Sequence, residues 1–175
     1  SAFFSGRIFY GGLDVTKESS KIYFSQIIES AAQYGMCYQI NDPNSEELFD
    51  LLPSDGGIID LLDAGKILKM IPMFNYLVVF CTNGVWIVTG SQGKGFTAND
   101  YSIERLSKMP LFSNTSFVEA EGVPYWWTNE GIYTIISDPQ TNSLRVQSIT
   151  DGIIREFILE DILAESKLFL RGSYN

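Results

Sequence analysis

The stretch Asn75–Gly90, NYLVVFCTNGVWIVTG, decides the fold that we expect for this chain. It contains two runs of large apolar and β-branched residues, one on each side of a Thr-Asn-Gly sequence. Such runs favour strands, and an Asn-Gly pair between them is typical of a tight hairpin. We expect a type I′ turn at Asn83-Gly84, because both central residues of that turn need a positive φ.

A weaker copy of this pattern follows at residues 123–137, VPYWWTNEGIYTIIS. Its turn, TNEG at residues 128–131, also lies between aromatic and β-branched residues. The glycines of the two turns, Gly84 and Gly131, are 47 residues apart. Short strands that return at such a spacing indicate an all-β protein built from repeated units.

The remaining apolar runs extend these hairpins to units of four strands. One unit takes strands at about 58–63, 76–82, 85–89 and 101–106, with residues 66–72 leading into its hairpin. The next takes strands at about 117–120, 124–128, 132–136 and 144–149. Four-stranded units at a period of roughly 40–50 residues are typical of β-propeller blades. A Greek-key sandwich or an irregular β-barrel is the alternative.

We expect one propeller-like region over residues 1–175, forming a partial propeller or an excerpt of a longer chain, because so few blades cannot close a ring. The expected blades span about 1–50, 55–108, 115–152 and 153–175. The first is partial, with strands at 6–10 and 21–25 and a helical insert at 42–52 that Asp42 and Pro43 would begin. The last holds an amphipathic helix at 153–163 and the start of another strand.

The composition argues for a packed core and against several kinds of function. Hydrophobic residues make up 45% of the chain and charged residues only 19%. The net charge of −9, without any Lys/Arg-rich run, argues against tight binding of nucleic acid. The absence of His removes the commonest general base and metal ligand. We expect Cys37 and Cys81 to be buried free thiols, and the apolar run at 77–88 is too short to span a membrane.

No motif in the chain points to a specific chemistry. The acidic residues at 42–50 lack the spacing of a calcium loop, and Gly93-Lys94-Gly95 lacks the pattern of a phosphate loop. Paired carboxylates of a glycosidase could come only from Asp60 with Asp63 or Glu119 with Glu121. We therefore expect no catalytic, cofactor-binding or metal-binding residues and no enzyme activity.

An aromatic run at Tyr125-Trp126-Trp127 allows two interpretations. If these side chains are exposed, they could stack on a sugar, as in an adhesin or a receptor-binding head. If they are buried, they belong to the core, which is the commoner place for large aromatic side chains.

Eight short segments of the sequence, taken in their order along the chain, resemble those of a known protein family. They are GRIFYGG at 6–12, IYFSQ at 22–26, CYQ at 37–39, NDPNSE at 41–46, DGGII at 55–59, LVVF at 77–80, GVWIVTG at 84–90 and FTA at 96–98. In this order they resemble the propeller region of podovirus tail nozzle proteins, the tail tubular protein B or packaged-DNA stabilisation family. The similarity extends over nearly the whole chain, although members of that family are several times longer.

The resemblance implies a structural protein of the virion with no active site. Nozzle proteins of this family form a sixfold ring below the portal and adaptor, and DNA leaves through its channel. For this chain the resemblance implies a homo-oligomer with portal, adaptor and other tail proteins as partners. It also implies DNA that passes without sequence-specific binding, a role in DNA retention and ejection, and assembly in the host cytoplasm. The alternative is a β-propeller binding module, such as an adhesin or receptor-binding head.

Overall fold

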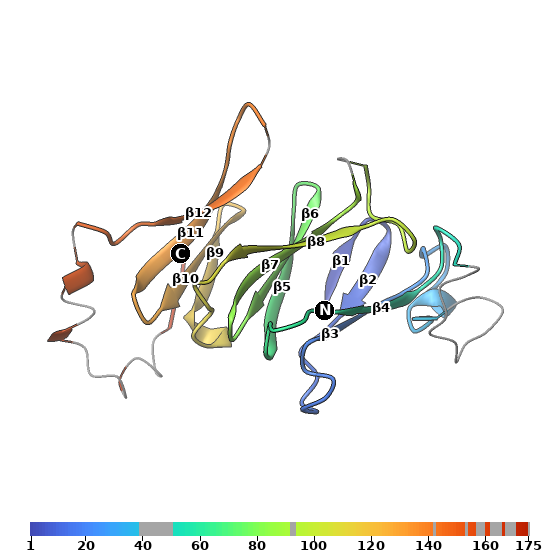
Figure 1. The fold of residues 1–175 in the computed structure, drawn as a ribbon, viewed down its shortest axis with the longest axis horizontal. Coiled ribbons are helices and arrows are strands. Elements are labelled where there is room, and N and C mark those ends of the chain that lie inside the picture. Colours follow the sequence, from blue (N-terminus) through green and yellow to red (C-terminus); the bar gives the residue numbers. More distant parts are fainter. Residues whose placement is uncertain are drawn as a thin grey trace.

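The computed structural model of the chain describes residues 1–38, 51–91, 94–141, 143–152, 154–156, 160–161, 166 and 171–174. These residues form three four-stranded antiparallel sheets and almost no helix. The all-β prediction is therefore confirmed. Figure 1 shows the three sheets side by side along the long axis of the molecule, in the order of the chain.

Each sheet is a meander, because strands that follow one another in sequence pair with one another. The first sheet consists of β1 (Ala2–Phe4), β2 (Arg7–Tyr10), β3 (Lys21–Phe24) and β4 (Gly57–Asp60). The middle sheet consists of β5 (Ile67–Met73), β6 (Tyr76–Cys81), β7 (Gly84–Thr89) and β8 (Ser102–Ser107). The third consists of β9 (Phe117–Ala120), β10 (Val123–Thr128), β11 (Gly131–Ser137) and β12 (Leu144–Ser148). Two short 3-10 helices, η1 (Ala31–Gln33) and η3 (Asn114–Ser116), lie in the connections.

The middle sheet is buried on both faces by its neighbours. Along β6, Leu77 and Val79 pack into the cluster shared with the first sheet, whereas Val78 and Phe80 pack into the cluster shared with the third. Successive side chains of a strand point to opposite faces, so one strand supplies both clusters. This position explains why β6 and β7 are continuous apolar runs rather than alternating ones.

The middle and third sheets repeat with an offset of 47 residues. The strands β6 and β10 begin at Tyr76 and Val123, and β7 and β11 begin at Gly84 and Gly131. Both glycines have nearly the same φ, +141° and +140°. The repeat that the sequence predicts for these two hairpins is confirmed.

The type I′ turn that we expected at Asn83-Gly84 is wrong, although the hairpin itself forms. Cys81 pairs with Gly84, so the two turn residues are Thr82 and Asn83, and neither has a positive φ. The positive φ falls one residue later, on Gly84, where β7 begins. In the described chain both turn residues have a positive φ at Ser5-Gly6, between β1 and β2, and at Glu121-Gly122, between β9 and β10.

The expected grouping of strands is wrong at one place. The strand expected at 58–63 was assigned to the unit of the central hairpin, but β4 pairs with β3 in the first sheet. Its place in the middle sheet is taken by β5, in the segment expected only to lead into the hairpin. The chain leaves the first sheet at 61–66, where Asp63 and Gly65 both have a positive φ.

The sequence did not predict the strand β1 or the hairpin β5–β6, and the described residues include only parts of the two expected helices. The strand β1 was missed, and the hairpin β5–β6 was missed because its turn begins with Phe74, at φ +54°, rather than with a glycine. The helix expected at 42–52 lies outside the described residues, except for its last two. Of the helix expected at 153–163, the described Arg155 and Glu156 are helical.

We expect Gly131→Ala to lower the free energy of unfolding by about 2 kcal/mol. At φ +140° an L-residue is strained, and an added Cβ would lie 2.2 Å from the Thr150 Oγ1 atom. Urea unfolding monitored by tryptophan fluorescence measures the loss. Gly35→Ala is the matched control, because no atom lies within 4 Å of its added Cβ, and it should change stability by less than about 0.5 kcal/mol. Equal losses in the two variants would contradict this account.

Candidate functional site

The first sheet contains one fully buried cation, Arg7. Its side chain is 0% exposed and lies on the face of β2 that packs towards the middle sheet. The Nη1 atom donates to the carbonyl oxygens of Ser25 at 2.8 Å and Ser54 at 3.2 Å, and to that of Asp55. The Nη2 atom donates to the carbonyl oxygen of Pro53. One guanidinium thus fastens the segment before β4 to the first sheet.

The surroundings of Arg7 combine a low-polarity environment with one opposite charge. Its guanidinium carbon lies 5.7 Å from the ring centre of Phe24 and 5.8 Å from that of Phe96. Burial lowers the pKa of Arg7 to about 10, and the carboxylate of Asp55 opposes this shift. Arg7 Nε and Asp55 Oδ1 are both buried without a hydrogen-bond partner. The group remains charged at neutral pH, and its described contacts make it a structural clamp.

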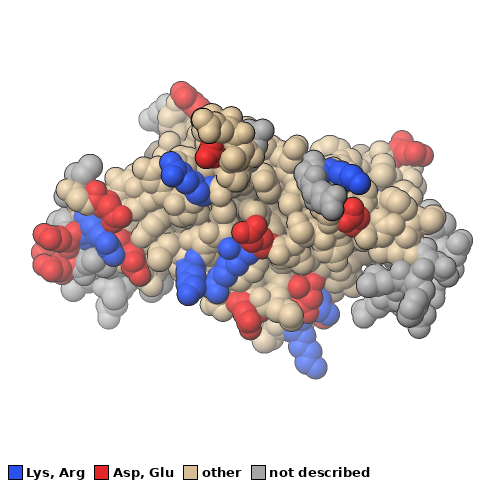
Figure 2. All heavy atoms as spheres, turned by 45° about the horizontal axis from the view of Figure 1, so that its top comes forward, with Lys and Arg blue, Asp and Glu red and all other residues tan. Residues whose placement is uncertain are grey.

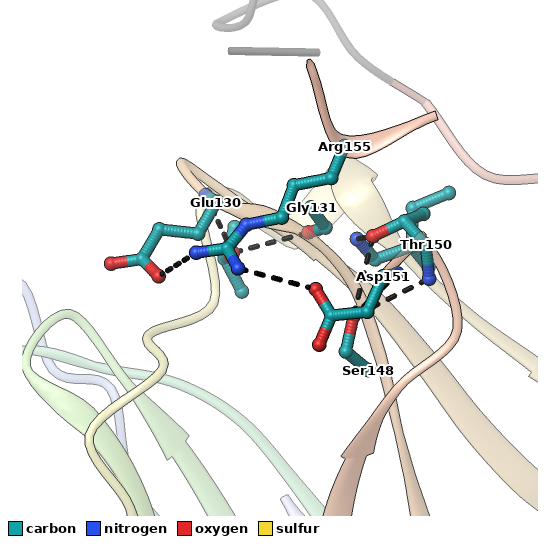
Figure 3. A network of polar contacts seen from close by, with 8 residues as sticks. Glu130, Gly131, Ser148, Thr150, Asp151 and Arg155 are labelled. Carbon is teal, nitrogen blue, oxygen red and sulfur yellow. Dashed lines mark hydrogen bonds and ion pairs between the residues drawn. The ribbon is translucent and has the colours of Figure 1, made fainter. Parts of the chain in front are cut away.

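The polar network of Figure 3 joins the end of β12 to the turn between β10 and β11. Arg155 lies between two carboxylates, 3.3 Å from Glu130 and 3.4 Å from Asp151. Beside these two ion pairs, the Thr150 hydroxyl accepts a hydrogen bond from the backbone N–H of Ile132 at 3.2 Å. Exposed ion pairs of this kind contribute little to stability, typically about 0–1 kcal/mol. The described contacts of this network fasten the turn between β10 and β11 to the segment after β12.

The middle sheet has a related arrangement 47 residues earlier. Arg105 of β8 donates to the backbone oxygen of Asn83, the residue that corresponds to Glu130. Its guanidinium carbon also lies 4.9 Å from the ring centre of Trp86. An arginine therefore secures the equivalent turn in the middle and third sheets, from β8 in the middle sheet and from the segment after β12 in the third.

Charged side chains are mixed in sign on the face drawn in Figure 2. Lys and Arg side chains there alternate with Asp and Glu, and no large area of one sign is visible among the described residues. Proteins that hold nucleic acid tightly gather cations along the path of the phosphates. This face has no such path.

The outer face of the third sheet points away from the middle sheet. Trp126, Tyr133 and Ile135 fill the inner cluster, so the alternating residues face outwards. Tyr125 and Trp127 of β10 are half-buried there. Ile132 and Ile136 of β11 continue the same apolar face.

The first sheet has a corresponding outer face at the other end of the molecule. Phe9 and Phe24 point into the cluster shared with the middle sheet, and their strand neighbours point away from it. The outward residues are Phe3, Ile8, Tyr10, Tyr23 and Ile58. Phe3 is 62% exposed, and the others are half-buried. Each terminal sheet therefore presents an apolar face that no other described sheet covers.

The structure separates the aromatic residues that sequence analysis grouped as a sugar-stacking candidate. Trp126 is 0% exposed, with its ring centre 5.1 Å from that of Phe80, so it belongs to the core. Only Tyr125 and Trp127 reach the outer face. The core interpretation is confirmed for Trp126.

The carboxylates considered for glycoside hydrolysis have structural partners or exposed positions. Asp60, at the end of β4, accepts a hydrogen bond from Ser20 at 3.0 Å. Glu121 lies in a turn and accepts one from Tyr174 at 3.1 Å, while Glu119 is exposed on the edge strand β9. Asp63 has a positive φ, and its backbone oxygen accepts from Asn83.

The two cysteines are free thiols. Cys81 is fully buried, and burial raises its pKa to about 12, whereas Cys37 is half-buried. Among the described residues, no group of three or more Cys, Asp or Glu side chains could hold a metal ion. No helix in the described part of the chain is long and apolar enough to cross a membrane.

Sequence reasoning did not identify Arg7 as a buried charge, although one signal was present. In the phrase RIFY at 7–10, period-2 alternation places Arg7 on the same face as Phe9. The outer faces were also missed, because a face can be assigned only once the neighbouring sheets are known.

The chain matches no known family model, and a search of curated proteins finds no match either.

Proposed function

We propose that this chain is a β-propeller module of a short-tailed phage tail, in a nozzle-like protein that encloses or flanks the DNA exit channel. The observation that carries the proposal is the middle sheet, which is buried on both faces by four-stranded sheets of the same kind. First strands contact first strands, β1 with β5, and last strands contact last strands, β8 with β12. Neighbouring propeller blades stack in this way.

Five of the eight phrases that carry the family resemblance overlap strands of the sheets. Residues 6–12 contain β2, residues 77–80 lie in β6, and residues 84–90 contain β7. Much of the resemblance therefore rests on segments that build the stacked core. This agreement supports assigning the sheets to a nozzle-type propeller.

The charge pattern suits a wall beside DNA. The net charge is −9, and positive side chains on the viewed face are interspersed with negative ones. Such a surface repels the phosphates overall and offers no counterion-releasing groove. In the proposed virion, DNA passes the module without being bound, and the contacts of the protein are with itself, the portal, the adaptor and other tail proteins.

The alternative, an adhesin-like binding module, has weaker support. It depended on an exposed aromatic run, and the central residue of that run, Trp126, is buried. Tyr125 and Trp127 remain half-buried on an apolar face whose residues fit contact with another protein surface better than with a sugar.

Purified particles test the proposal. We expect the chain in short-tailed virions in a fixed ratio to the portal and adaptor, with six copies around the tail axis in a cryo-electron microscopy reconstruction. Deleting its gene should give heads that package DNA and then lose it. Absence of the chain from purified virions, or normal DNA retention after the deletion, would overturn the proposal.

A further inference from the structure

The middle sheet carries an exposed aromatic side chain on its first turn. Phe74 begins the turn between β5 and β6 and is 65% exposed, and Figure 1 shows this turn at the upper end of the sheet. Its φ of +54° lies in the left-handed region, which bulky L-residues rarely adopt. Exposed apolar surface and a strained backbone both oppose folding. A strained residue that also exposes its ring points to a role outside the core.

The other two sheets show which side chains the fold accepts at this turn. Ser5 and Glu121 begin the equivalent turns, between β1 and β2 and between β9 and β10, with φ of +50° and +53°. In the middle sheet Phe74 is followed by Asn75, which has no positive φ. This pattern matches a type II′ turn, in which glycine is preferred at the first position. The repeat therefore gives no structural reason for an aromatic ring at Phe74.

The turn holds this ring in a fixed place. Thr89 Oγ1 donates to the backbone oxygen of Asn75 at 2.8 Å, and Met73, directly before the turn, is buried. An aromatic side chain has few rotatable bonds, so it loses little conformational entropy when a partner covers it. Aromatic side chains that fill a pocket of the partner are typical centres of protein interfaces.

The connections at this end of the three sheets are acidic. The accessible charged residues described on them are four acids and one lysine: Glu29, Asp100, Glu121, Asp138 and Lys94. The four ion pairs among the described residues all lie at the opposite end of the sheets. Acidic residues without an ion pair repel nucleic acid and anionic lipid, and they attract a basic protein surface.

We propose that Phe74 anchors a separate protein partner by entering an apolar pocket bordered by Lys and Arg side chains. The ring supplies most of the affinity, whereas the acidic residues around it speed and orient the encounter. The inference rests on the proposed function for its setting, in which the partner is another protein of the phage tail.

Photo-cross-linking from position 74 identifies the partner. The photoreactive residue p-benzoylphenylalanine replaces Phe74 in the full-length product of the gene, which is produced together with the other proteins of its own genome. Irradiated cells and particles are then analysed by mass spectrometry. We expect a covalent product with one other protein, in a region of it that is rich in Lys and Arg. Leu62 is the control position, because it is 77% exposed at the opposite end of the sheets, and it should not give this product.

The purified cross-linked protein then allows the affinity to be measured. Phe74→Ser, which copies the equivalent residue of the first sheet, should weaken binding at least about tenfold. The control Leu62→Ser should leave the dissociation constant unchanged. Raising the salt concentration from about 50 to about 300 mM should slow association several-fold, because it screens the acidic residues from the basic surface.

A stability measurement separates an anchor from a structural residue. Phe74→Gly should lower the equilibrium constant for unfolding by about fivefold, because glycine adopts a positive φ without strain. The same variant should bind the partner at least about tenfold more weakly. Loss of binding together with a gain in stability distinguishes this effect from unfolding of the chain.

Several results would overturn the proposal. They are equal cross-linking from positions 74 and 62, no product from position 74, or a product with DNA, lipid, another copy of the chain or another segment of the same polypeptide. A tenfold rise in the unfolding constant of Phe74→Gly would also overturn it, since Phe74 would then serve the fold. Absence of the chain from virions would overturn the proposed tail function alone, because cross-linking in cells still detects a partner at Phe74.

Discussion

Replacing Arg7 with alanine should lower the free energy of unfolding by about 4 kcal/mol, the largest loss that we expect from any single polar side chain. The substitution removes the donor of four backbone carbonyls, including those of Pro53 and Ser54. It also leaves the buried carboxylate of Asp55 without its neighbouring cation. Urea unfolding monitored by tryptophan fluorescence measures the change.

Two further variants show whether geometry or charge alone explains the loss. Arg7→Lys keeps the positive charge but cannot reach four carbonyls with a planar fork, so it should still lose about 2 kcal/mol. Arg171→Ala removes an exposed arginine and should change stability by less than about 0.5 kcal/mol. A loss below about 1 kcal/mol for Arg7→Ala would show that the guanidinium does not clamp the segment before β4.

The hairpins β6–β7 and β10–β11 could be predicted from the sequence because their information is local. Apolar runs, a glycine at the start of the second strand and the interval of 47 residues are all visible in the chain itself. The exact turn could not be predicted, since Asn-Gly fits a type I′ turn at Asn83-Gly84 as well as the observed turn at Thr82-Asn83. Only the pairing of the strands selects between them.

The allocation of β4 and β5 depended on information that is not local. Both segments are short and apolar, and the break between them, at 61–66, resembles the other turns in composition. The hairpin β5–β6 turns at Phe74-Asn75, and the positive φ lies on Phe74, a residue type that rarely adopts it, so Asn75 is the single turn signal there. Which strand joined which sheet was decided by the pairing of β4 with β3, across more than 30 residues of chain.

The partners of Arg7 were beyond sequence reasoning for the same reason. Alternation in β2 assigns its face, but three of its four carbonyl partners lie 46 to 48 residues later. Those oxygens belong to the backbone, so no side-chain type marks them. The outer faces depend likewise on the stacking order of whole sheets, which follows only after every strand has been assigned.

Trp126 provides the second large effect, because it fills the centre of the cluster between the middle and third sheets. Its ring centre lies 5.1 Å from that of Phe80 and 6.2 Å from that of Tyr133. Trp126→Ala would open a cavity there and should lower the free energy of unfolding by about 4 kcal/mol. Urea unfolding measured by circular dichroism is suitable, since the substitution removes a fluorophore.

The neighbouring Trp127 makes this a test of strand register. A slip of one residue along β10 would exchange the environments of the two tryptophans. In the observed register Trp127 is half-buried, so Trp127→Ala should cost less than about 2 kcal/mol. Trp126→Phe should cost less than Trp126→Ala, because the ring still fills the site and the buried Nε1 atom, which has no partner, is removed. A larger loss from Trp127→Ala than from Trp126→Ala would mean that β10 presents its opposite face to the middle sheet.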